Sequence, residues 1–192
     1  MTLRPIQALL LLLLPLPGLA LAAVERTIDA ETGLRAWAWR EAGVSLQLVQ
    51  RLPDQTRGFF LARGFSAEAV ERIANACVFQ TIFRNESDQP LDYSLDDWRV
   101  VQPGVRTDLV TRERWDAAWQ AGEASEASRI ALRWALLPTR QRFEPGDYNW
   151  GMTAFGLAPG MTFELELVVR HGDDQVVRIV DGIECAPDRE GN

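Results

Sequence analysis

The stretch MTFELELVVR, residues 161–170, decides the fold because apolar and polar side chains alternate along it. Successive side chains of an extended chain point to opposite faces, so this alternation predicts a β-strand with one buried and one solvated face. The predicted buried face holds Met161, Phe163, Leu165, Leu167 and Val169. Burial on one face only is typical of antiparallel sheets.

The same alternation recurs in residues 44–48, 77–84 and 130–137. The predicted buried faces hold Val44, Leu46 and Leu48; Cys77, Phe79 and Phe83; and Ile130, Leu132, Trp134 and Leu136. Turn-forming residues separate the apolar runs, and those at 156–160 and 171–174 are predicted to close hairpins. We therefore expect about eight or nine short strands.

Two segments depart from the alternation and are predicted to be helices. In FSAEAVERIAN, residues 65–75, Ser66 suits an N-cap, and Phe65 and Val70 have the spacing of a hydrophobic staple. In TRERWDAAWQ, residues 111–120, two tryptophans lie four residues apart on one helix face. The sequence therefore predicts a mainly β fold, an antiparallel β-sandwich in the immunoglobulin-like style with one or two short helical insertions.

Residues 1–22 are predicted to form a secretory signal peptide. Arg4 precedes an apolar run, two prolines and the small-residue pattern Ala20-Leu21-Ala22. The apolar run is shorter than the roughly 20 residues that a membrane-spanning helix requires. We therefore expect residues 23–192 to form a single β-sandwich domain, periplasmic or secreted, with no integral membrane segment after cleavage.

The charge of the chain argues against two classes of partner. There are 27 acidic and 20 basic residues, every basic one an arginine, and the net charge is −7. Proteins that bind nucleic acid or anionic membranes present an excess of positive charge. No nucleic acid partner is expected.

Cys77 and Cys185 are the only cysteines, and an even number in an exported protein predicts a disulfide. The bond would link the C-terminal strand to an inner strand. It would close a loop of about 108 residues and stabilise the fold by up to about 4–5 kcal/mol. The chain has no Cys-x-x-Cys motif, so a redox role is not expected.

Met152, Met161 and His171 lie close in the sequence and raise the question of a soft-metal site. If residues 161–170 form one strand, Met161 and His171 are about 33 Å apart, and Met152 is about 23 Å from the level of His171. They cannot share an ion, so neither a metal nor another cofactor is expected. Met161 is predicted to fill the core, and His171 to be exposed in a turn.

Catalytic motifs are scarce. The sequence has no G-x-S-x-G elbow, no H-E-x-x-H motif and no glycine-rich phosphate loop. Asp96 and Asp97 form the visible carboxylate pair, but neighbours on a strand point to opposite faces. The change of hydrophobic phase at this pair favours a β-bulge, and a non-enzymatic protein is predicted.

Seven tryptophans are the most unusual feature of the composition. Trp134 is predicted to lie in the core. Trp37 and Trp39 are predicted to share one face of a strand, and either face of that strand could be the buried one. The candidate binding surface lies in the helix at 111–120 and contains Trp115, Trp119, Arg112 and Arg114. These tryptophans either pack the helix against the sheet or form an exposed ridge that contacts a partner.

The leading hypothesis is an exported, non-enzymatic binding or accessory protein of the cell envelope. Its partner would be an envelope or secreted protein, because interfaces concentrate aromatic residues and arginine. Two alternatives remain open: a carbohydrate-binding module that presents exposed tryptophans to a glycan, and a periplasmic copper-handling accessory protein. A hydrolase ranks below these and would need two carboxylates at catalytic separation.

Overall fold

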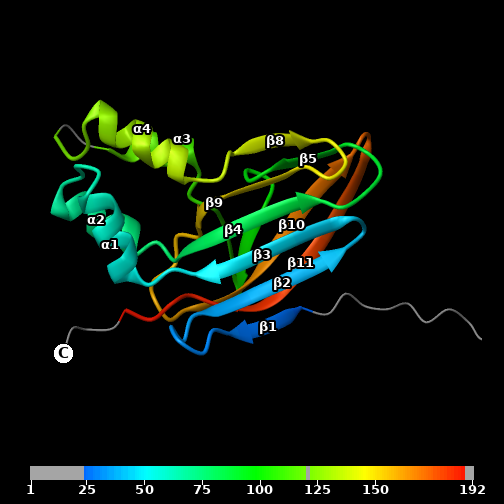
Figure 1. Ribbon diagram of the computed structural model, residues 1–192, viewed down its shortest axis with the longest axis horizontal. Coiled ribbons are helices and arrows are strands. Elements are labelled where there is room, and N and C mark those ends of the chain that lie inside the picture. Colours follow the sequence, from blue (N-terminus) through cyan, green and yellow to red (C-terminus); the bar gives the residue numbers. More distant parts are fainter. Residues whose placement is uncertain (1–23, 120–121, 189–192) are drawn as a thin grey trace, which may run out of the picture.

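Two antiparallel β-sheets pack face to face, and four short helices cover one end of the pair (Figure 1). The computed structural model describes residues 24–119 and 122–188, so the predicted signal peptide, residues 1–22, lies outside the described residues. The predicted mainly β fold, a β-sandwich with helical insertions, is confirmed. Within the described residues no helix is long and apolar enough to cross a membrane.

Sheet A lies in front in Figure 1 and has five strands. In spatial order they are β1 (Glu25–Ile28), β2 (Arg35–Glu41), β3 (Val44–Gln50), β4 (Val78–Asn85) and β9 (Tyr148–Ala154). The edge strands are therefore β1 and β9.

Sheet B lies behind sheet A and is built around the long strand β10. Its strands are β5 (Leu91–Ser94), β6 (Arg99–Gln102), β7 (Val105–Asp108), β8 (Arg140–Phe143), β10 (Thr162–His171) and β11 (Asp174–Glu184). Strand β11 pairs with β10 as a hairpin that the turn at 171–174 closes, as predicted. Strands β5 and β6 also pair with β10, β8 pairs with β5, and β7 pairs with β6.

The core lies between the sheets and follows the predicted alternation. The inward side chains of β3 and β4 are buried, and so are those of β10 after its first residue. They are Val44, Leu46 and Leu48; Phe79 and Phe83; and Phe163, Leu165, Leu167 and Val169. Trp37 and Trp39 of β2 point into the same core.

Met161 was predicted to fill the core, and this prediction is wrong. Strand β10 begins one residue later, and Met161 lies in the preceding turn with 43% of its surface exposed. The predicted hairpin at residues 156–160 is also wrong, since β9 pairs with β4 in sheet A and β10 belongs to sheet B. Residues 156–160 cross from sheet A to sheet B. The pairing of β9 with β10 on which the predicted hairpin depends therefore does not exist.

Asp96 and Asp97 lie between β5 and β6, two strands that pair with successive parts of β10. Arg99 is six positions after Tyr93, whereas their partners Glu166 and Val169 on β10 are only three positions apart. The extra residues form a turn between two separate strands. The predicted change of phase is therefore present, but it is a larger interruption than a one-residue β-bulge.

The helices come from two insertions, which together form a region that we call the helical lobe. Helices α1 (Pro53–Leu61) and α2 (Ala67–Ala74) connect β3 to β4, and α3 (Arg112–Ala118) and α4 (Glu126–Ala135) connect β7 to β8. Helices α2 and α3 match the two predicted helices, and the Ser66 side chain accepts a hydrogen bond from Ala69 N at 3.2 Å, as expected of an N-cap. The lobe has its own buried cluster.

Residues 130–137 were predicted to form a strand with Trp134 in the core, and this prediction is wrong. Residues 126–135 form α4, which Ser125 caps by accepting a hydrogen bond from Ser128 N. Residues two apart on a helix are rotated by about 200°, so burial of Leu132 turns Trp134 outward. Trp134 is 84% exposed.

The predicted disulfide between Cys77 and Cys185 is confirmed, with the two Cα atoms 5.2 Å apart. Cys77 lies just before β4 of sheet A, and Cys185 just after β11 of sheet B. The bond therefore joins the two sheets next to the helical lobe. An oxidising, extracellular location fits such a buried bond.

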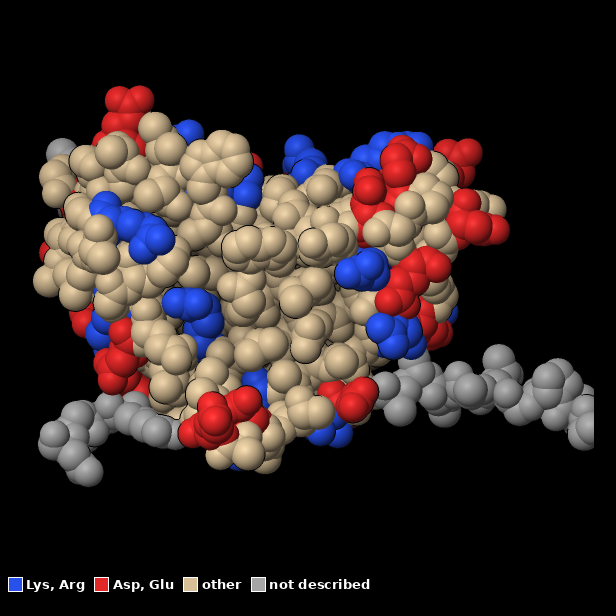
Figure 2. Space-filling view, in the orientation of Figure 1, with Lys and Arg blue, Asp and Glu red and all other residues tan. Residues whose placement is uncertain are grey.

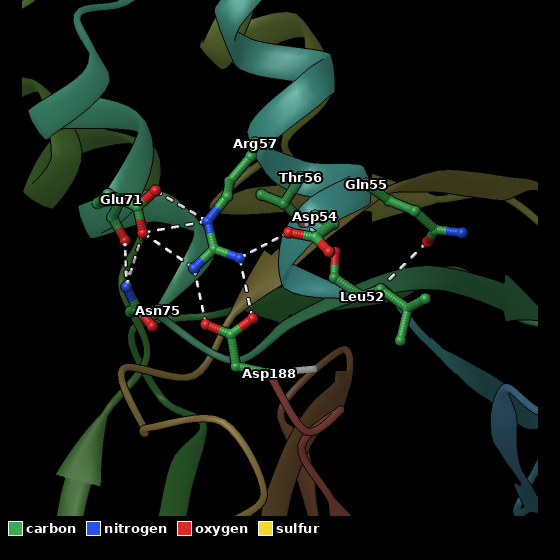
Figure 3. Close-up of polar contacts among 8 residues, drawn as sticks. All are labelled: Leu52, Asp54, Gln55, Thr56, Arg57, Glu71, Asn75 and Asp188. Atoms are coloured by element: carbon green, nitrogen blue, oxygen red, sulfur yellow. Dashed lines mark hydrogen bonds and ion pairs between the residues drawn. The ribbon is translucent and has the colours of Figure 1, made fainter. Parts of the chain in front are cut away.

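Arg57 of α1 holds the segment after the disulfide against the helices (Figure 3). Its guanidinium binds Asp188, Glu71 of α2 and Asp54 at distances of 2.7, 2.8 and 2.8 Å. The hydrogen bonds from Arg57 lower the pKa of Asp188 below its ordinary value. One arginine therefore connects three separate segments of the chain.

Candidate binding surface

The predicted tryptophan pair lies inside the helical lobe. Trp115 is only 5% exposed, and its ring stacks on the half-buried Trp119 with centroids 5.3 Å apart. Phe65 packs against Trp119 at 5.4 Å, and the Arg72 guanidinium lies over the same ring at 5.0 Å. The pair therefore connects the two helical insertions, and Trp115 has no open face for a partner.

The two predicted arginines point to different neighbours. Arg112 is half-buried and donates to the carbonyl oxygen of Leu136, and burial lowers the pKa of its guanidinium. Arg114 is bound to Asp108 by an ion pair at the surface. The structure does not bring Arg112, Arg114, Trp115 and Trp119 together into one exposed patch.

The exposed aromatic side chains lie on and beside edge strand β9. Trp150 is 65% exposed and Tyr148 is 56% exposed, and both point away from the core. Trp134 lies nearby, because α4 contacts β9 and the Leu137 N–H that follows it donates to Met152 O at 2.9 Å. Neither Tyr148 nor Trp150 was predicted from the sequence, although they alternate with Asn149 and Gly151 as strand residues do.

Strand register shows which side chains surround these rings. Outward positions on β2, β3, β4 and β9 lie in rows across sheet A, and one row joins Ala38, Gln47, Ile82 and Trp150. We call the outward side chains of these four strands that the lobe leaves uncovered the sheet A face. They are Ala36, Ala38, Arg40, Ser45, Gln47, Val49, Gln80, Ile82, Arg84, Tyr148 and Trp150.

The sheet A face contains no carboxylate, although the chain has 27 acidic residues. Figure 2 shows this side of the molecule, with an uncharged central area, arginines at its borders and acidic side chains grouped towards the periphery. Two acids border the face: Glu25 of edge strand β1 lies opposite Ala38, and Glu86, just after β4, binds Arg40 of the face at 2.7 Å. The face is therefore apolar at its centre, and of its own two arginines Arg40 is paired with Glu86 whereas Arg84 lies over the ring of Tyr148.

No family model, curated protein or solved structure matches this chain. Its function is therefore inferred from its sequence and from the geometry of the described residues.

Asp96 and Asp97 were predicted to point to opposite sides, and this prediction is wrong. Both line one groove of about 510 Å³ on sheet B, because they lie in a turn instead of a strand. Asp96 binds Arg140 at 2.7 Å and Asp97 binds Arg170 at 2.6 Å. The two carboxylates are thus held in ion pairs with arginine.

The candidate metal ligands lie in different parts of the structure. Met152 is buried in the helical lobe cluster, and Met161 lies in the turn before β10. His171 was predicted to be exposed in a turn, but it is the half-buried last residue of β10, paired with Asp174 next to the β10–β11 turn. That turn is at the end of the sandwich opposite the helices (Figure 1). In residues 24–119 and 122–188, no three His, Cys, Asp or Glu side chains are grouped as metal ligands.

Proposed function

We propose that this protein is an exported, non-enzymatic binding protein of the cell envelope, and that the sheet A face contacts its partner, another envelope protein. The main support is the exposure of Trp150 and Tyr148 on a face without carboxylates. A few residues supply most of the binding energy at protein interfaces, and tryptophan, tyrosine and arginine are enriched among them. Covering such an exposed ring with a partner is energetically favourable, since it removes a large apolar area from water.

Export is supported by two independent features. The N-terminal residues have the composition of a signal peptide, and the disulfide is of the kind that persists in oxidising compartments. A non-enzymatic role is supported by the ion pairs that hold Asp96 and Asp97, the pair that a hydrolase would have needed.

Site-specific crosslinking in the native host tests the proposed surface. A photo-crosslinking amino acid at Gln47, in the middle of the sheet A face, is expected to yield one discrete protein adduct. The matched control is Val177 of β11, an exposed position on sheet B, which should yield none. Trp150→Ala should abolish the Gln47 adduct. Equal adducts at both positions, or an adduct unaffected by Trp150→Ala, would contradict the proposal.

Carbohydrate binding is the second candidate, because Trp134 and Trp150 are two exposed tryptophans near one sheet edge. Indole rings are flat platforms for sugar rings. Affinity electrophoresis through gels that contain cell-envelope polysaccharides tests this candidate. Retardation that both Trp134→Ala and Trp150→Ala remove would favour a glycan over a protein partner, and unchanged mobility in every gel would eliminate it.

A further inference from the structure

Three arginines around the sheet A face have no carboxylate partner in the described part of the chain. They are Arg51, Arg63 and Arg84, whose guanidinium groups lie over aromatic rings. Most other arginines bind acids, as Arg57, Arg140 and Arg170 do. In a chain with a net charge of −7, unpaired arginines gathered around one face are an unexpected arrangement.

The unpaired arginines lie at both ends of the face. At the end next to α1, Arg51 and Arg63 contact the same ring, Phe59, at 5.4 and 3.3 Å. At the opposite end, Arg84 lies 4.7 Å from the ring of Tyr148. Arg84 pairs with Ser45, which is six residues before Arg51, so the two ends are about 20 Å apart along the strands.

The guanidinium group of Arg51 lacks a suitable polar partner within the described part of the fold. Its Nε is buried without a hydrogen-bond partner, and burial together with the neighbouring charge of Arg63 lowers the pKa of its guanidinium. A carboxylate from outside the chain that contacts the exposed part of this arginine pair would offset both charges.

The middle of the face is suited to aliphatic side chains. Between the arginines lie Ala36, Ala38, Val49 and Ile82, with only the amides of Gln47 and Gln80 among them. Gln80 Nε2 already donates to Gly151 O at 3.2 Å. A glycan needs many hydrogen-bonding groups for its hydroxyls, whereas an apolar peptide needs a surface such as this one.

We propose that the sheet A face binds an extended polypeptide segment in which apolar residues are flanked on both sides by aspartate or glutamate. The inference rests on the proposed function and specifies the chemistry of the partner. The two arginine ends bind the carboxylates, and the aliphatic centre covers the apolar residues. The net charge of the chain disfavours polyanions in general, but the local charge of this face is positive, and local charge governs contact.

Peptide selection tests the proposal and does not require the partner to be identified. The disulfide-bonded protein is immobilised and offered a display library of random twelve-residue peptides. Enriched peptides are expected to carry acidic residues about six positions apart around an apolar centre, since six extended residues span about 20 Å. An enriched peptide with its Glu or Asp changed to Gln or Asn should bind about tenfold more weakly.

Variants locate the contacts. Arg51→Gln, Arg63→Gln and Arg84→Gln should each weaken an enriched peptide by about two- to fivefold and reduce the salt dependence of its Kd. The matched control, Arg140→Gln, removes an exposed arginine of sheet B and should leave the Kd unchanged. Trp150→Ala should weaken the same peptide.

The outcomes separate this inference from the proposed function. Enriched peptides that are neutral or basic but still depend on Trp150 would overturn the acidic-segment inference and leave the binding surface intact. Polygalacturonate that binds in a Trp150-dependent way, with no peptide enriched, would overturn both in favour of an acidic glycan. Enrichment of peptides that bind independently of Trp150 and of all three arginines would also overturn both.

Discussion

The helical lobe and the sheet A face use the same residue types for opposite purposes. In the lobe, Trp115 and Trp119 stack under an arginine and connect two insertions. On the face, Trp150 and Tyr148 are exposed beside Arg84. Tryptophan next to arginine therefore does not by itself identify a binding surface, and what covers the rings decides their role.

The largest expected effect is in the lobe. Trp115→Ala removes a buried ring from the contact between the insertions and should lower the free energy of unfolding by about 3–5 kcal/mol. Urea denaturation followed by circular dichroism measures this change. A Trp115→Ala protein as stable as the unmodified one would show that the lobe does not depend on this ring, and the contrast with the face would disappear.

An intermediate effect is expected at Arg57. Arg57→Gln leaves Asp54, Glu71 and Asp188 without their shared counter-charge and should cost about 1 kcal/mol at neutral pH. Because Arg57 lowers the pKa of Asp188, the part of this stabilisation that comes from Asp188 is present above pH 3.8, the ordinary value, and is lost as the pH falls through the lowered value.

Denaturation at pH 7 and at about pH 2.5 checks this dependence. The difference between Arg57→Gln and the unmodified protein should shrink at the lower pH. Arg26→Gln is the control, because it breaks an exposed ion pair with Asp181 and should have a smaller effect at neutral pH. A difference for Arg57→Gln that stays constant across this range would contradict the role assigned to the Asp188 carboxylate.

The smallest stability effect is expected on the exposed rings. Trp150→Ala and Trp134→Ala should each change the free energy of unfolding by no more than about 0.5 kcal/mol. Acrylamide should quench the fluorescence of these two residues more than that of Trp115. Variants with single Trp→Phe substitutions assign the quenched fluorescence to each tryptophan. A loss of several kcal/mol for Trp150→Ala would mean that the ring stabilises the fold and is not held ready for a partner.

Most of the sandwich could be predicted because its strands bury one face in steps of two. The exception, residues 130–137, has the same alternation inside a helix. Ser125 and Glu126 at its start and Arg133 in its last turn are helix signals that precede or overlap the apolar run. The segment is helical because the cap and the buried (i, i+4) pair Leu132 and Leu136 favour a helix more than the short alternating pattern favours a strand.

The exposed rings of β9 could not be predicted because this strand reverses the usual rule. Its inward positions include Asn149 and Gly151, and the aromatic residues point outward. Asn149 donates to Gln141 at 2.7 Å inside the fold. A side chain at Gly151 would lie 2.5 Å from the backbone nitrogen of Leu137, so that position must stay empty. Both reasons depend on contacts with the segments before β9, which the alternation within β9 does not show.

The disulfide also fixes the order of events during synthesis. Cys185 follows Cys77 by 108 residues, which takes about 5–20 s at common elongation rates of about 5–20 residues per second. Throughout this interval Cys77 has no native partner, and the apolar side of β4 lacks the β10–β11 hairpin that covers it. A newly made chain therefore passes through a period in which a free thiol and an uncovered strand face coincide. Correct maturation depends on oxidation that comes after the last strand has emerged.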